Sequence, residues 1–311
     1  MRQDMTYVYT VYQEGSFSKA AEKLFLTQPA LSISIQKIEQ SIGMPLFDRS
    51  RRPLQLTEAG EIYIDTIKKT LLLEKEQQQR LNDIRDLATG TVQLGGSHYL
   101  NAYILPDILT GFSRKYPGIR LEIIESGSSA LAEMLADNKL DLTFSCHPQM
   151  IREFDRFEMF EDHILLAVPD AHPINSGLEE YALTSFDVLN GRHTSPNCPA
   201  IELNAFSDLE FILLRKGNNL YDRAQNMFRA AGFEPKIKLS ISQLVTAFHL
   251  AAANMGATFV SDRLVKSAEV PLKYYKLLSS FTNRMFYMLL PRREYTSFAV
   301  RALIQYIQEN L

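Results

Sequence analysis

The stretch from Ser16 to Gly60 constrains the fold of this chain more than any other segment. Three apolar residues are spaced to share one face of a short first helix, namely Ala21, Leu24 and Phe25. Residues 26–28 indicate a tight corner, and Pro29 suits the first turn of a second helix, where its missing N–H costs no hydrogen bond. On that second helix we expect three residues to face a core, Leu31, Ile35 and Ile38. This spacing predicts a helix-turn-helix, a motif whose second helix enters the major groove of DNA.

The outward face of the second helix, placed by turning 100° per residue from Leu31, carries side chains that suit DNA. Glutamine can hydrogen-bond adenine through two atoms, serine and lysine suit phosphate, and an exposed isoleucine can touch a thymine methyl group. An ordinary helical hairpin with a solvated polar face is the alternative, but the basic loop that follows favours DNA. The candidate DNA-binding residues are Thr27, Gln28, Pro29, Ser32, Ile33, Gln36, Lys37, Arg49, Arg51 and Arg52.

Two short strands, Leu46-Phe47 and Leu54–Leu56, are expected on either side of that basic loop. They would form a wing that lays the arginines on the sugar–phosphate backbone or in the minor groove. Arginine in the minor groove senses groove width more than base identity. The alternative, that these arginines only solubilise the surface, is less consistent with their position directly after the second helix.

This stretch resembles the N-terminal domain of the LysR-type transcriptional regulators. The matching residues are Gly15–Phe17, Ala20-Ala21, Leu24, Thr27–Ser32, Ile38-Glu39, Gly43, Pro45–Phe47, Arg49 and Leu56–Gly60. The resemblance implies a bacterial regulator that is not an enzyme, with a winged helix-turn-helix domain over residues 1–58. It also implies a homodimer or homotetramer that binds double-stranded DNA at a two-fold-related promoter site, and RNA polymerase if it activates. Family members commonly carry a basic residue or histidine where this chain has Ile33, so we expect Ile33 to contact thymine instead.

Charge, hydropathy and cysteine usage indicate the possible partners and the cellular location of the protein. The formal net charge is −3 over 311 residues, which does not exclude DNA binding because such contacts need only a local basic surface. The N-terminus lacks the layout of a signal peptide, and no apolar run approaches membrane-spanning length. We therefore expect a cytoplasmic protein with no membrane partner, whose two cysteines, Cys146 and Cys198, are free thiols.

A long helix is predicted from Thr57 to about Ala88, with Thr57 as its N-cap. The middle of this helix is too polar to be buried in a globular core. Its apolar residues fit a coiled-coil or antiparallel seam instead, at Ile64, Ile67, Leu71, Leu81, Ile84 and Ala88. We assign residues 59–89 as a linker and dimerisation helix, which is the use that the family makes of this segment.

The pattern after Gly90 alternates strands with helices, which predicts α/β architecture with sheets covered on both faces. Strands are expected at 91–97, 120–125, 142–145, 163–169, 211–214, 258–261 and 287–290, and helices at 104–112, 128–138, 220–231, 242–255 and 294–310. This half is similar to the family's effector-binding domain, which has the two-lobed periplasmic-binding-protein (type 2) fold. We assign residues 90–162 and 269–311 to lobe I and residues 163–268 to lobe II. The irregular segment 174–205 is longer than expected and could reshape the rim of the cleft.

Polar residues follow several of these strands, and ligands of two-lobed α/β domains bind at such strand ends. The residues offer hydroxyl and amide donors and some positive charge, with few carboxylates, which favours a small anionic metabolite as co-inducer. For any single serine, helix capping without a ligand contact is the alternative. The candidate effector-binding residues are Ser97, His98, Tyr99, Ser126, Gly127, Ser128, Ser145, Cys146, His147, Arg215 and Gly217.

We predict no catalytic residues, no metal and no bound cofactor, since the sequence shows no nucleophile elbow, phosphate-binding glycine loop or cluster of metal ligands. Cys146 and His147 are adjacent on an extended strand end, where side chains point apart, and a metal site needs more ligands than these. Four histidines are assigned structural or surface roles only, namely His163, His172, His193 and His249. Two alternatives are a redox-responsive regulator that uses Cys146 and Cys198 and, for residues 90–311 alone, a solute-binding module.

Overall fold

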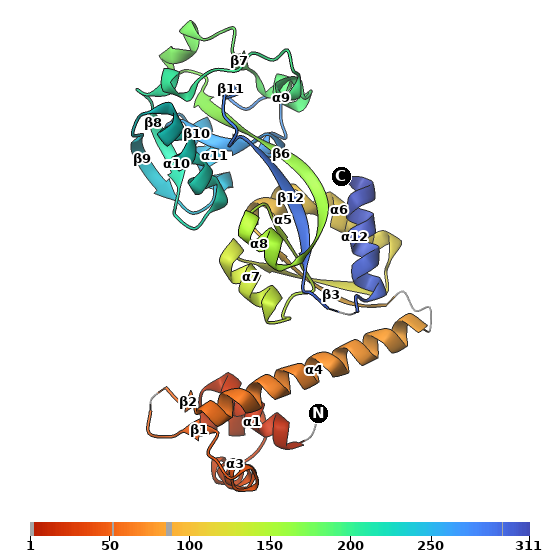
Figure 1. Cartoon of the computed structure of the whole chain (residues 1–311). Coiled ribbons are helices and arrows are strands. Elements are labelled where there is room, and N and C mark those ends of the chain that lie inside the picture. The colour runs from red at the N-terminus through yellow and green to blue at the C-terminus, as the bar shows by residue number, and fades with distance from the viewer. Residues whose placement is uncertain (1–2, 52, 85–88, 294) are drawn as a thin grey trace. The chain divides into compact units, whose positions relative to one another are not determined.

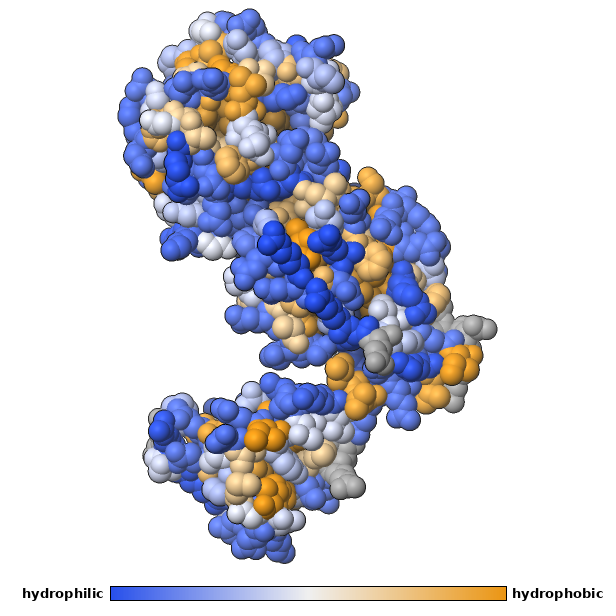
Figure 2. Space-filling model, in the orientation of Figure 1, coloured by the Kyte–Doolittle hydropathy of each residue, from blue (hydrophilic) through white to orange (hydrophobic). Residues whose placement is uncertain are grey.

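A computed structural model describes residues 3–51, 53–84, 89–293 and 295–311 of the chain. It divides into two compact units, Met1–Arg85 and Asp86–Leu311, which are drawn in Figure 1. Among the described residues, no helix has the length and apolar character to cross a lipid bilayer. In the view of Figure 2, hydrophilic residues cover most of the visible surface of each unit, and hydrophobic residues gather in small groups.

The N-terminal unit is helical with one small hairpin. Its elements are α1 (Gln3–Glu14), α2 (Phe17–Lys23), α3 (Gln28–Ile42), β1 (Phe47–Asp48), β2 (Gln55–Leu56) and α4 (Glu58–Ile84). The strands β1 and β2 are antiparallel and form the wing. The core of this unit draws on every helix and on the base of the wing, through Val8, Val11, Ala20, Ala21, Leu31, Ile35, Leu46, Phe47, Ile64 and Ile67.

Local signals in the sequence explain where the helix-turn-helix begins and ends. The Thr27 side chain accepts a hydrogen bond from the backbone N–H of Ala30 and caps α3, and Gly43 ends α3 with a left-handed φ of 82°. The prediction that Phe25 faces the core is wrong, because its side chain is 97% exposed. Helix α2 ends at Lys23, and Phe25 adopts a positive φ of 54°, so the neighbours Leu24 and Leu26 pack against the core instead.

Helix α4 begins at Glu58, directly after Thr57, its predicted N-cap. The Thr57 hydroxyl oxygen accepts a hydrogen bond from the N–H of Gly60 at 3.0 Å. The predicted seam of this helix divides into two parts. Ile64 and Ile67 are buried in the core of the N-terminal unit, whereas Leu81 and Ile84 are exposed. The predicted position Ala88 lies outside the described residues.

The C-terminal unit is built on a sheet with strand order β4-β3-β5-β12-β6-β11-β7, and β10 also pairs with β6. A second sheet pairs β8 with β9 in parallel. The strands are β3 (Gly90–Gly96), β4 (Ile119–Glu125), β5 (Leu142–Ser145), β6 (Asp155–Pro169), β7 (Ala182–Leu183), β8 (Glu210–Leu214), β9 (Lys236–Ile241), β10 (Thr258–Ser261), β11 (Leu272–Tyr275) and β12 (Asn283–Leu290).

Helices and short 3-10 turns connect and cover these strands. The helices are α5 (His98–Tyr103), α6 (Leu105–Lys115), α7 (Ser128–Ala136), α8 (Pro148–Glu153), α9 (Ser185–Leu189), α10 (Asn219–Ala231), α11 (Leu244–Ala252) and α12 (Phe298–Asn310), and the 3-10 turns are η1 (Pro173–Gly177), η2 (Arg192–Thr194), η3 (Leu203–Phe206) and η4 (Asp262–Leu264). Helix α12 was predicted to start at residue 294. It starts at Phe298, because the side chain of Ser297 caps it.

The long strand β6 belongs to both lobes. Its residues 155–163 pair with β12, and its residues 164–169 pair with β10 and β11. Figure 1 shows β6 and β12 running side by side between the lobes. The pairing partner of β6 changes between His163 and Ile164, one residue after the predicted first boundary. The second boundary, predicted at residue 269, disagrees with the pairing of β11. Strand β11 pairs with β6 and β7 in lobe II, so the chain returns to lobe I only with β12.

Candidate DNA interface and effector pocket

The outward face of α3 carries the predicted base-reading residues. Gln28, Pro29, Gln36 and Lys37 are exposed, and Ile33 is 53% exposed. Exposure of an isoleucine on a helix whose other isoleucines pack inward leaves an apolar group available to a thymine methyl. Thr27, by contrast, uses its hydroxyl oxygen to cap the helix, so it has a structural role whether or not it also meets DNA.

Arg49 is held by the protein itself. Its guanidinium lies 3.1 Å from Oε2 of Glu39, donates to the Ser32 hydroxyl at 3.3 Å and sits 4.9 Å from the centre of the Phe17 ring. The other oxygen of Glu39 accepts from the backbone N–H groups of Leu46 and Phe47. These bonds tie the recognition helix α3 to the base of the wing, so Arg49 first of all positions the interface.

Arg51 is the predicted wing residue that is most open to a partner. Its side chain is 66% exposed, with an ion pair to Asp48 at 3.4 Å and a hydrogen bond to Gln55 at 3.0 Å. An exposed ion pair contributes little to stability, and phosphate can replace the Asp48 carboxylate at small cost. Arg52 lies outside the described residues.

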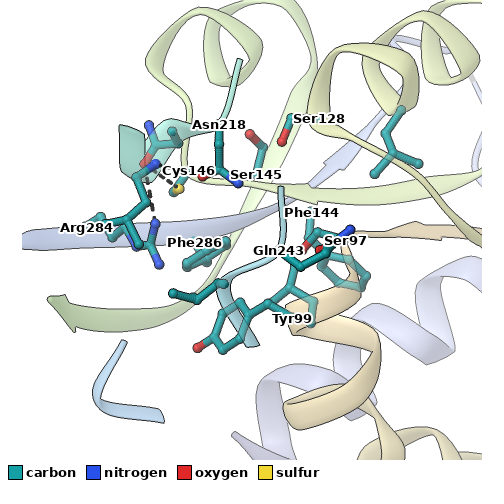
Figure 3. A pocket seen from close by; sticks show the side chains of 15 residues that line it. Ser97, Tyr99, Ser128, Phe144, Ser145, Cys146, Asn218, Gln243, Arg284 and Phe286 are labelled. Atoms are coloured by element: carbon teal, nitrogen blue, oxygen red, sulfur yellow. Dashed lines mark hydrogen bonds between the residues drawn. The ribbon is translucent and has the colours of Figure 1, made fainter. Parts of the chain in front are cut away.

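The pocket of the C-terminal unit lies between the lobes, at the ends of strands β3, β4, β5 and β8. Its cavity volume is about 80 Å³, several times the space that one water needs. Figure 3 shows the side chains around it. Both lobes contribute to the wall, through Ser97, Tyr99, Leu100, Ser128, Leu131, Phe144, Ser145, Cys146, Asn218, Asn219, Leu220, Gln243, Leu244, Arg284 and Phe286.

The predicted effector residues fall into three groups. Five line this inner pocket: Ser97, Tyr99, Ser128, Ser145 and Cys146. An adjoining outer hollow, which shares Ser97 and Ser128, is lined by five others: His98, Ser126, Gly127, Arg215 and Gly217. His147 lines neither, since its ring caps α8 and faces a separate hollow between α8 and α10.

Sequence reasoning missed a buried ionic network in the pocket wall. The Nε of Arg284 donates to Asp162 at 2.6 Å, and the hydroxyls of Tyr99 and Ser261 both bond the other oxygen of Asp162. Arg284 and Asp162 are 4% and 0% exposed. Burial alone would lower the pKa of Arg284, but the charge of Asp162 outweighs it and raises that pKa. The network joins α5 of lobe I to β10 of lobe II at the crossover.

The Tyr99 hydroxyl is committed to this network, at 3.0 Å from Asp162 and 2.7 Å from Ser261. Burial, reinforced by the Asp162 charge, raises the pKa of Tyr99 well above its usual value, so the phenol stays neutral. Tyr99 therefore lines the pocket with its ring, and its hydroxyl helps to hold together the network at the crossover between the lobes, here called the hinge network.

The two cysteines do not form a redox pair. Both are free and buried. Cys146 follows β5 in lobe I and its thiol donates to Asn219 at 3.2 Å, whereas Cys198 lies in lobe II next to the carbonyl of Pro199. Burial raises the pKa of Cys146, and a protonated thiol is a poor nucleophile. The redox-responsive alternative is therefore not favoured.

Helix N-termini give the pocket a positive potential. The pocket wall includes residues at the first turn of α7, α10 and α11, at Ser128, Asn219 and Leu244. Unpaired N–H groups and the helix dipole at such ends favour anions. Arg223 adds a further cation beside Asn219, since it donates to that side chain and to the backbone carbonyls of Phe281 and Asn283. Asn219, Gln243 and Arg284 are pocket residues that the strand-end signal did not reveal.

Comparison with known proteins identifies the family of both units. The chain matches a bacterial regulatory helix-turn-helix protein, lysR family, over residues 2–61 and a LysR substrate binding domain over residues 85–311. It is 30% identical over 264 residues to the HTH-type transcriptional regulator CfxR of Cupriavidus necator, covering 84% of this chain and 75% of CfxR.

Two solved structures share the fold. The crystal structure of full-length CbnR complexed with its target DNA aligns over 100% of both chains, with 18% identity and a TM-score of 0.63. The effector binding domain of QuiR in complex with shikimate covers 71% of this chain and 96% of its own, with 15% identity and a TM-score of 0.56. With the winged helix-turn-helix and the two-lobed α/β unit both matched, the chain belongs to the LysR family of bacterial DNA-binding transcriptional regulators.

Proposed function

We propose that this regulator is switched by a small carboxylate metabolite bound between the lobes of its C-terminal unit. The observation that carries the proposal is the pocket itself, where serine and amide side chains surround the N-termini of α7, α10 and α11. Arg223 lines the separate hollow between α8 and α10 and bonds Asn219 of the pocket wall, and it donates to carbonyl oxygens rather than to a carboxylate. The cation of Arg284 is already neutralised by Asp162, so the helix ends and Arg223 supply the attraction.

Switching requires that the ligand bind two arrangements of the lobes with different affinity. Residues of the pocket wall come from both lobes, Ser97 and Ser128 from lobe I and Asn218 and Gln243 from lobe II. A ligand that bonds both sides holds them together and changes the strain on β6 and β12, the strands that join them. The proposal includes binding without turnover of the ligand.

The Ser97→Ala, Ser128→Ala double variant tests the pocket. A panel of small carboxylic acids, shikimate among them, is screened against the full chain by thermal shift, and the best binder is titrated calorimetrically. Hydrogen bonds to a charged group contribute about 1.5–3 kcal/mol each, so losing two should weaken binding at least about 100-fold. Ser129→Ala is the matched control, since Ser129 is exposed on the same turn and lines neither hollow. Unchanged affinity in the double variant would place the ligand elsewhere.

We also propose that Gln28 reads bases and that Arg51 contacts phosphate. Gln28→Ala should weaken cognate DNA binding by about 1–3 kcal/mol and leave binding to random DNA nearly unchanged, because a bidentate base contact carries sequence information. Arg51→Ala should weaken binding to cognate DNA and to random DNA, and it should reduce the slope of log affinity against log salt by about one. Fluorescence anisotropy at several salt concentrations measures both effects, with Lys69→Ala on α4 as the charge control. An equal loss on both DNAs for Gln28→Ala, or an unchanged slope for Arg51→Ala, would reject the assignment concerned.

The exposed apolar residues of α4 support a role in self-association. Leu73, Leu81 and Ile84 are 66%, 45% and 79% exposed on a helix that buries its first turns in the DNA-binding unit. A helix face of this kind is typical of a dimerisation seam. We propose that α4 joins two copies of the chain, which places two recognition helices on one DNA site.

A further inference from the structure

We propose that His163, His193 and Asp262 form a binding site for a divalent first-row transition metal ion. The three residues come from separate elements: His163 lies on β6 at the crossover, His193 on the turn η2, and Asp262 at the start of η4. One ligating atom from each lies within 4.8 Å of the other two. The sequence did not predict this cluster because 69 residues separate His193 from Asp262 and 99 separate His163 from Asp262.

The distances suit a metal ion with small adjustment. Oδ2 of Asp262 lies 3.1 Å from Nδ1 of His163 and 2.9 Å from Nε2 of His193. Around tetrahedral zinc, with bonds of about 2.0–2.2 Å, neighbouring ligand atoms are roughly 3.3–3.6 Å apart. A shift of a few tenths of an ångström therefore opens space for the ion. Two imidazoles and one carboxylate leave a fourth position for water, and this ligand set suits zinc, cobalt, nickel or copper.

The surroundings favour a cation. Oδ1 of Asp262 accepts from the backbone N–H groups of His163 and Arg263, which fixes the carboxylate and leaves Oδ2 to face both imidazoles. The Glu161 carboxylate lies 3.8 Å from Nε2 of His163, on the side of the ring away from Asp262. A carboxylate in that place orients a metal-binding histidine. Asp162 next door is paired with Arg284. Glu161 and Asp262 add two negative charges to the site, and Arg263, whose guanidinium donates to the Glu161 carbonyl, offsets one of them.

One feature limits the affinity. Nδ1 of His193 is buried and has no hydrogen-bond partner within the part of the chain that the structure describes. An ion on Nε2 moves the ring proton to Nδ1, where no acceptor receives it. Metal-binding histidines normally donate that proton, and losing such a partner costs about 10–100-fold in affinity. We therefore expect micromolar rather than nanomolar binding of Zn²⁺.

The position of the site suggests what an ion there would do. His193 belongs to the irregular segment 174–205, and the ion would fasten this segment to β6 and η4. His163 and Asp262 directly follow Asp162 and Ser261, the carboxylate and hydroxyl of the hinge network. The metal ion would thus act on the crossover from outside the effector pocket, whose lining includes none of the three ligands.

Zn²⁺ titrated into the full chain tests the site, in competition with a chromogenic chelator and without DNA or any carboxylate ligand. We expect one ion per chain, with at least about 100-fold weaker binding in His193→Asn and in Asp262→Asn. Glu161→Gln should lose about tenfold. His249→Asn is the control, because His249 is an exposed histidine outside the cluster, and its ring contacts Tyr103 and Phe248. Circular dichroism checks the fold of each variant.

Cobalt provides a second measurement that does not depend on the variants. Co²⁺ bound by the unmodified chain should give the strong visible absorption of a four-coordinate site, and added Zn²⁺ should remove it. Absence of saturable Zn²⁺ binding, or equal affinity in His193→Asn, would overturn the proposal and leave the three residues as a hydrogen-bonded cluster. Either failure leaves the proposed switching by a carboxylate untouched, since that is measured at a different pocket.

Discussion

Replacing Asp162 by asparagine should destabilise the C-terminal unit by about 3–5 kcal/mol, the usual cost of removing one partner from a buried ion pair. Arg284 would remain charged and buried, because its side chain is only 4% exposed and its guanidinium lies over the Phe286 ring. The hydroxyls of Tyr99 and Ser261 would also lose an anionic acceptor. Breaking the pair therefore affects both lobes at their joint.

Differential scanning calorimetry of the full chain measures this loss. For a unit of about this size each kcal/mol shifts the midpoint by about 2–4 °C, so a loss of about 3–5 kcal/mol lowers it by about 6–20 °C. The same substitution at Asp170, which directly follows β6 and pairs with Lys273 of β11 at 3.0 Å on the surface, should cost less than about 1 kcal/mol. Equal shifts for the two variants would show that the Asp162 pair is solvated rather than buried.

The neutral double variant, Asp162→Asn with Arg284→Gln, separates charge from packing. It removes the uncompensated cation, so it should recover much of the stability lost by Asp162→Asn. Its response to a bound carboxylate should still differ from that of the unmodified chain, because the network links α5 to β10. Stability that stays as low as in the single variant would mean that lost hydrogen bonds, not the unpaired charge, account for the effect.

The DNA-binding unit was predictable from sequence because its signals are local. A capping threonine, a proline in the first helical turn and a glycine at the helix end all act within a few residues of one another, at Thr27, Pro29 and Gly43. Phe25 was placed wrongly because the spacing of apolar residues does not show that the chain leaves the helix there with a positive φ.

The effector pocket was only partly predictable because half of it depends on distant pairing. Ser97 and Ser128 follow strands that the pattern showed, so they were found. Arg284 was missed, because nothing near it in sequence places it beside Asp162, 122 residues away. The antiparallel register of β12 on β6 brings them together. The predicted lobe boundary at residue 269 disagrees with the structure for a similar reason, since β11 is short and its partner strands are distant in sequence.

Gly60→Ala should abolish DNA binding, although glycine-to-alanine exchange inside a helix ordinarily stabilises by about 1 kcal/mol. A Cβ at Gly60 would lie 2.0 Å from the backbone carbonyl oxygen of Leu46, far inside contact distance. That carbonyl also accepts from the N–H of Thr57 at 3.0 Å, so it cannot move without detaching the wing from α4. Overpacking of this kind costs about 1–3 kcal/mol or more, and here the obstacle is backbone rather than a side chain that could rotate.

Calorimetry and DNA binding together check this prediction, because Gly60 lies in the N-terminal unit and the carboxylate pocket lies in the other unit. In a unit of about 85 residues, each kcal/mol shifts the midpoint by about 4–8 °C, so the transition of the N-terminal unit should fall by several degrees or disappear. Binding of a carboxylate to the other unit should persist. Thr66→Ala, at an exposed position of the same helix, should leave both properties intact. If Gly60→Ala instead raised the midpoint, helix propensity would outweigh the contact with Leu46. If the variant also bound DNA normally, the close approach of α4 to the wing would not be needed for DNA binding.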